Sequence, residues 1–141
     1  MPRPCLRDRR GSVTVLFALL TTIMFTVAAI ALDLVTVWTA RRNAQGAADL
    51  AAILAASRPD DRDATARRAL SDNGFKKEAP SATVTFGTYT SDTAILPENR
   101  FAASPIAVNA VKVAFATTVT TTFSRIVGLP SVFTVPASAT A

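Results

Sequence analysis

Few residues in this 141-residue chain could do chemistry. It has no histidine, and Cys5 is its only cysteine, so the usual zinc sites, histidine-based triads and an intrachain disulfide are excluded. Serines and threonines are abundant, and a Ser-Lys dyad using Lys76, Lys77 or Lys112 is conceivable, but no Gly-x-Ser-x-Gly turn accompanies them. The five glycines stand singly, which argues against a phosphate-binding loop. The sequence therefore predicts no catalytic residue, no metal site and no cofactor, and a protein that is not an enzyme.

One acidic residue has an unusual place. Asp33 directly follows a segment of twenty residues, 13–32, that carries no charge. Its carboxylate could mark the end of a membrane span and lie among lipid headgroups. Alternatively, it could pair with a cation on a neighbouring helix, because acids at the edge of a membrane tend to have partners.

The uncharged segment has the length of a transmembrane helix. Residues 13–32 are apolar except for four threonines, whose hydroxyls can bond to carbonyls of the preceding helical turn. Twenty helical residues span about 30 Å, the thickness of a bilayer core. Secretory signal peptides have shorter apolar regions, but the Ala-Ile-Ala before Leu32 also offers a cleavage site after Ala31. A membrane anchor is the preferred interpretation.

The positive charge of the chain belongs to a membrane flank. Of a net charge of +5, residues 1–12 contribute +3, through Arg3, Arg7, Arg9 and Arg10 against a single acid. This cluster predicts a cytoplasmic N-terminus and places residues 34–141 on the periplasmic side of a bacterial inner membrane. The remaining charge forms no basic face with interleaved aromatic residues, so membrane lipid is an expected partner and nucleic acid is not.

A helical pattern continues beyond the span, over residues 33–57. Small and apolar residues recur there in 3.5-residue steps, which predicts a stripe that permits close helix packing. The candidate helix-interaction residues are Asp33, Val37, Ala40, Ala44, Ala47, Ala51 and Leu54. The stripe could pack on the outer domain of the same chain or on another subunit, so a homo-oligomer is possible.

Two stretches resemble a known family. "RRGSVTVLFALL", "AIALDL" and "ARRNAQGAADLAAILAA" are similar, in order and spacing, to the N-terminal region of TadG-like proteins of the Flp (Tad) pilus assembly system. The tail, from "NAVKVAFATTV" to "PASATA", also resembles these proteins and their TadE-like relatives. The resemblance implies a structural, single-pass membrane component whose partners are other pilus assembly or secretion proteins.

Two departures from the family pattern limit what can be carried over. Larger TadG-like proteins have a von Willebrand factor A domain with an Asp-x-Ser-x-Ser metal site, and this chain has no such motif. TadE-like and TadF-like pseudopilins have a glutamate five residues after a cleaved glycine. Counted from Gly11, that position is Leu16 here. We therefore expect the basic arm to be retained, while cleavage after Gly11 would make the chain a processed minor pilin and cleavage after Ala31 a secreted binding protein.

The remainder predicts a small α+β domain. Pro59 and the acids after it favour a second helix that ends at Asn73-Gly74. Strands are expected over residues 81–89, 107–119 and 131–141, with a long loop over 90–107 and a short helix over 121–128. Pro136 indicates an edge strand or a bulge.

Together these patterns predict a long N-terminal helix followed by a small α+β domain with about three antiparallel strands. The expected division is a basic cytoplasmic arm at 1–12, a transmembrane helix at 13–32, its continuation at 33–57 and a periplasmic domain at 58–141.

Overall fold

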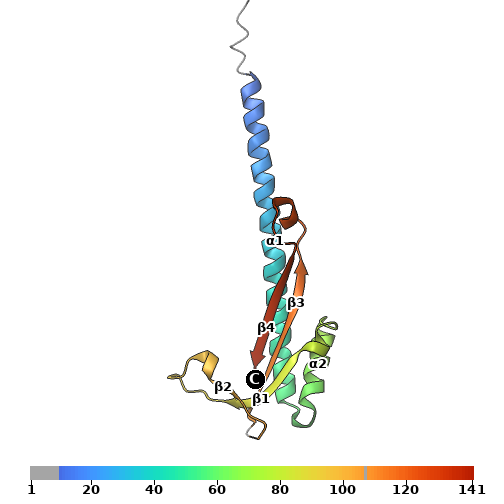
Figure 1. Ribbon diagram of the computed structural model, residues 1–141, viewed down its shortest axis with the longest axis vertical. Helices are drawn as coiled ribbons and strands as arrows, with labels where there is room; N and C mark the ends of the chain where they lie inside the picture. Colours follow the sequence, from blue (N-terminus) through green and yellow to red (C-terminus); the bar gives the residue numbers. More distant parts are fainter. Residues whose placement is uncertain (1–9, 107) are drawn as a thin grey trace, which may run out of the picture.

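The computed structural model describes residues 10–106 and 108–141. Its dominant element is α1 (Arg10–Ala56), one helix of 47 residues that joins the apolar segment to the globular part without a break (Figure 1). No proline interrupts this stretch, which is rich in alanine and other strong helix formers. The predicted continuation of the apolar helix is therefore confirmed. Cys5, Arg3, Arg7 and Arg9 lie outside the described residues.

Three threonines in the apolar half of α1 form hydrogen bonds within the helix. The hydroxyl of Thr21 donates to the carbonyl of Phe17 at 2.8 Å, and that of Thr22 donates to the carbonyl of Ala18 at 2.9 Å. Thr26 donates to Thr22 in the same way, at 2.9 Å. These bonds leave the helix surface apolar in spite of its hydroxyls.

A short second helix folds back beside the end of α1. The turn η1 (Pro59–Asp61) leads into α2 (Arg62–Asp72), as the proline and the acids predict. The helix stops where Gly74 takes a φ of 94°, a conformation that favours glycine. Arg67 of α2 bonds both Asp63, at 2.8 Å, and the carbonyl of Ala79, at 2.9 Å, and so fixes α2 to the chain that follows it.

The remaining elements form one antiparallel sheet. After η2 (Ala79–Ser81), the strands are β1 (Thr83–Tyr89), β2 (Phe101–Ala103), β3 (Ala110–Thr120) and β4 (Val132–Thr140), with η3 (Pro97–Asn99) before β2 and η4 (Ser124–Val127) before β4. The spatial order is β2-β1-β3-β4. β3 and β4 form a long hairpin that pairs from Lys112 with Thr140 to Thr120 with Val132. Pro136 therefore lies on an edge strand, as expected for a residue without a backbone donor.

Two details differ from the sequence prediction. The predicted loop 90–107 contains β2, a three-residue strand that pairs with β1 through Gly87, Thr88 and Tyr89. The strand is too short for its alternation to be recognised. The predicted helix 121–128 is a single 3₁₀ turn, η4, which ends at Gly128 with a φ of 75°.

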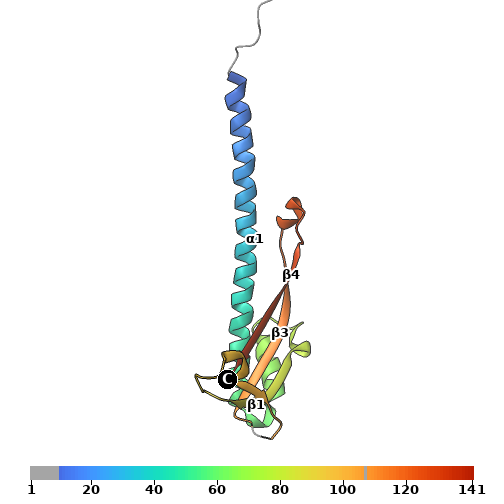
Figure 2. The ribbon, with the colours of Figure 1, turned by 60° about the vertical axis from the view of Figure 1, so that its left-hand side comes forward.

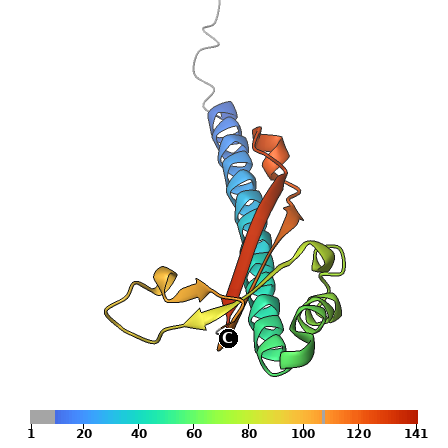
Figure 3. The same cartoon turned by 60° about the horizontal axis from the view of Figure 1, so that its bottom comes forward.

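The core lies between α1, the sheet and α2. α1 packs along β3 and β4 and against α2, so the long helix and the β3–β4 hairpin run side by side (Figures 1 and 2). Seen from below, α2 lies on one side of α1 while the β1–β2 end of the sheet projects away on the other (Figure 3). Most of the buried core residues are alanines, and the largest fully buried side chains are Leu70, Val111 and Val113. Phe75 packs edge-on against Phe115, with 5.0 Å between ring centroids.

Candidate functional site

The surface of α1 divides into two parts. Most residues from Gly11 to Leu32 are exposed, among them Phe17 and Phe25, each 70% exposed. Within Gly11–Ala56 this helix is long and apolar enough to cross a membrane, and the most apolar part is not buried by the rest of the chain. The second half of α1 carries the globular part.

The alanine stripe lies in the interface between α1 and its own globular part. Ala44, Ala47 and Ala51 are buried in the core cluster with residues of α2 and the sheet. Val37 and Ala40 are half-buried nearer to the apolar segment. Small side chains allow the helix backbone to approach the sheet closely, so this face of α1 is used within the chain.

The packed face is wider than the stripe that the sequence indicates. Ala48, Ala52 and Ala55 are also completely buried. A 3.5-residue repeat selects a narrow seam, whereas a helix that contacts both a sheet and a second helix buries a broader arc. The consecutive alanine pairs at 47–48 and 51–52 are the feature of the sequence that indicates this broader buried arc.

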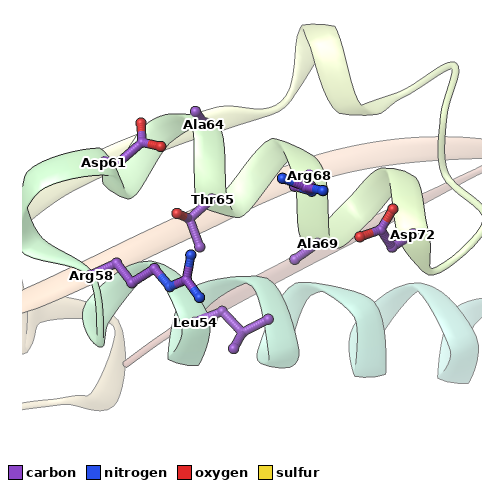
Figure 4. A pocket seen from close by; sticks show the side chains of 8 residues that line it. All are labelled: Leu54, Arg58, Asp61, Ala64, Thr65, Arg68, Ala69 and Asp72. Atoms are coloured by element: carbon purple, nitrogen blue, oxygen red, sulfur yellow. The ribbon is translucent and has the colours of Figure 1, made fainter.

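Leu54, the last candidate of the stripe, is 38% exposed. It lies at the edge of an open groove of about 470 Å³ between the end of α1 and α2 (Figure 4). Arg58, Asp61, Arg68 and Asp72 line the same groove. The residues that line the groove carry charges of both signs, but they do not include a nucleophile placed beside a base. The groove therefore has the character of a polar surface rather than an active site.

The side chain of Asp33 accepts four hydrogen bonds. Its carboxylate accepts hydrogen bonds from three consecutive backbone N–H groups of the β3–β4 connection. The N–H of Thr122 lies 3.1 Å from Oδ1, and that of Phe123 lies 3.0 Å from Oδ2. Ser124 adds both its N–H and its hydroxyl, the hydroxyl at 2.6 Å from Oδ2.

These contacts explain the ionisation of Asp33, which is 7% exposed and lies just beyond the uncharged segment. Burial acts to raise the pKa of the carboxyl group, but the hydrogen bonds from Ser124, Phe123 and Thr122 together lower it by more, so the net pKa is below the usual value of 3.8. The carboxylate is satisfied by donors of its own chain, at the first turn of η4. It therefore needs no cation from a neighbouring helix.

No sequence pattern predicts this pairing. Asp33 and Ser124 are 91 residues apart in the chain. The sequence does show an acid, Asp33, and a predicted short helix over 121–128. The N–H groups at the start of a helix have no partner within it, so they can donate to a carboxylate.

Metal-binding groups are not found in the part of the chain that the structure describes: no three histidine, cysteine, aspartate or glutamate side chains come together there. The surface that remains as a candidate site is the exposed half of α1 with the loop that Asp33 binds.

The comparison with known families agrees with this architecture. Residues 45–141, which include the end of α1 and the whole sheet, match the family described as Tad-like Flp pilus-assembly. The chain belongs to this family. Residues 11–58, almost all of α1, match a second family, described as Flp pilus-assembly TadE/G-like. The resemblance predicted from the sequence is confirmed at both ends of the chain.

Family membership also bears on activity. The Flp pilus-assembly family has no known catalytic activity. No curated protein and no solved structure matches this chain.

Proposed function

We propose that this Flp pilus-assembly protein is a single-pass structural component of the bacterial inner membrane. In this role α1 anchors the chain, and the globular part contacts other proteins of the pilus assembly or secretion apparatus in the periplasm. The observation that carries the proposal is the division of α1, with one half apolar and mostly exposed and the other packed on its own sheet. An exposed apolar surface of this size requires lipid or protein around it.

The orientation is tested with the native cysteine. Four arginines at positions 3, 7, 9 and 10 favour a cytoplasmic N-terminus. A membrane-impermeant thiol reagent should then leave Cys5 unlabelled in intact spheroplasts and label it after permeabilisation. The matched control replaces Cys5 with serine and places a cysteine at the exposed Ser57, which should be labelled without permeabilisation. Labelling of Cys5 in intact spheroplasts would reverse the proposed topology.

Processing distinguishes the anchor from the other two roles. Leu16 cannot pair with a free amine at Ser12 as a glutamate could, so little would be gained by cleavage after Gly11. We expect the protein extracted from membranes to retain residues 2–141. An intact mass that begins at Ser12 would assign the chain to the processed minor pilins, and one that begins at Leu32 would make it a secreted protein.

The partners are tested by in-cell photo-crosslinking. Phe17 and Ile53 are exposed on α1, one in the apolar half and one beside the globular part. A photoreactive residue at either position should yield adducts with pilus assembly proteins in cells. These adducts should vanish in a strain that lacks the assembly genes. Identical adduct patterns in both strains would contradict a role in the apparatus.

A further inference from the structure

The β3–β4 connection, residues 121–131, rises along α1 to the level of the apolar segment (Figures 1 and 2). Phe123 and Ile126 of this loop line a shared groove of about 400 Å³ with Thr22, Phe25 and Ile30 of α1. Residues 22–30 belong to the second half of the predicted span. At 1.5 Å per residue, they lie about 3–15 Å inside its boundary at Leu32.

The side chains at the tip of this loop are apolar and uncovered. Ile126 is 80% exposed, Leu129 is 53% exposed and Val132, at the start of β4, is 56% exposed. Between residues 113 and 141 the only charged side chain is that of Arg125. Its long stem can carry the guanidinium toward lipid phosphates, as arginines near membrane interfaces do.

Most backbone N–H groups of the loop are satisfied within the protein, which favours an apolar surrounding. Irregular backbone enters a membrane only where its polar groups are satisfied by the protein. Asp33 accepts the N–H groups of residues 122–124, and Ser131 accepts that of Thr121. Within the loop, the N–H groups of residues 126, 128 and 129 donate to carbonyls of residues 123–125, and Pro130 has none to satisfy.

We propose that the β3–β4 loop inserts into the lipid leaflet nearest the globular part and forms a second membrane contact beside α1. Asp33 is the positioning residue, because it binds the loop to the helix and removes three backbone donors from contact with lipid. The inference rests on the proposed membrane anchoring of α1, since the depth of the loop follows from the depth of the helix. The apolar surface of the loop is therefore covered by lipid acyl chains, which also cover the adjoining exposed face of the helix.

The test uses depth-dependent fluorescence quenching in vesicles. Trp38 is the only tryptophan, so Trp38→Phe gives a silent background in the full chain. Ile126→Trp then reports on the loop, and Phe17→Trp reports on the helix. Ala102→Trp, on the exposed short strand β2, is the control outside the membrane. Each variant is reconstituted into phosphatidylcholine–phosphatidylglycerol vesicles with or without bromine on the acyl chains.

We expect bromine to reduce the fluorescence of Ile126→Trp by a fraction comparable with that of Phe17→Trp, and to leave Ala102→Trp unchanged. Leu129→Trp repeats the measurement at a second exposed loop position and should give the same loss. If Phe17→Trp is quenched while both loop variants behave like Ala102→Trp, the loop lies outside the acyl chains or is covered by a second copy, and the proposal is overturned. If Phe17→Trp is not quenched either, membrane anchoring itself fails and the loop proposal fails with it.

Discussion

The alanine face of α1 offers the sharpest test of the fold. Ala51 is completely buried where α1 meets the globular part. Ala51→Leu adds three heavy atoms to a filled space, and overpacking of this kind lowers the free energy of unfolding by about 1–3 kcal/mol. For a globular part of this size, 1 kcal/mol corresponds to roughly 4–8 °C in Tm. We therefore expect Tm to fall by about 5–20 °C.

The assay is thermal unfolding of the detergent-solubilised chain, followed by circular dichroism. Ala64→Leu is the matched control, because Ala64 is exposed on α2 and the same change there should alter the free energy of unfolding by about 0.5 kcal/mol or less. Equal falls in Tm for the two variants would refute the packing described for this face. The Tm of the wild type should also be independent of protein concentration, because the interface lies within one chain. A concentration-dependent Tm would indicate that a second subunit contributes to it.

Three further outcomes are expected from the same assay. Folding lowers the pKa of Asp33, so the ionised carboxylate stabilises the fold above the unfolded pKa, and this effect is lost as the pH falls through the folded pKa. The difference in Tm between wild type and Asp33→Asn should therefore be constant from pH 5 to 8 and should decrease below about pH 4. A difference that increases on acidification would contradict the hydrogen-bonded carboxylate. Leu70→Ala removes a completely buried side chain and should cost about 2–5 kcal/mol, whereas Leu96→Ala, at an exposed position, should cost little. Gly87→Ala would place a Cβ against the carbonyl of Ala102 and 2.9 Å from Cζ of Phe101, so it should destabilise the β1–β2 pairing by about 1–3 kcal/mol. Gly46→Ala, in open space on α1, should stabilise the protein by up to about 1 kcal/mol. The test is whether the two variants change Tm in opposite directions.

The elements with strong local patterns could be predicted from the sequence. The continuous helix follows from an apolar and alanine-rich stretch without proline, and α2 follows from Pro59 and the acids behind it. β3 and β4 show long runs of strand-forming residues, and Pro136 marks β4 as an edge. In contrast, β2 has only three residues and owes its strand conformation to pairing with β1. Short strands depend on a neighbour that the local sequence does not reveal.

The site was harder to predict because its partners are distant in the chain. The position of Asp33 at the end of the apolar segment identified it as unusual, but its partners lie in a loop about ninety residues later. Ala44, Ala47 and Ala51 of the repeat are buried in the core, yet a repeat alone does not distinguish the chain's own sheet from another subunit. The partners of Asp33 and the partner of the alanine face both depend on how the β3–β4 hairpin packs along the helix.

The unbroken helix has a mechanical consequence. α1 has no proline between the apolar half and Ala56, and Asp33 ties the loop of the globular part to the same helix at a second point. The globular part is therefore held to α1 at two points, and if α1 spans a bilayer as proposed, a tilt of the helix carries the globular part with it. From Leu32 to Ala56 the helix is about 36 Å long, so a helix tilt of roughly 20° displaces its far end by about 12 Å parallel to the membrane. A neighbouring protein that changes the tilt within the lipid would thereby move the surface presented by α2 and the sheet, without any change in their fold.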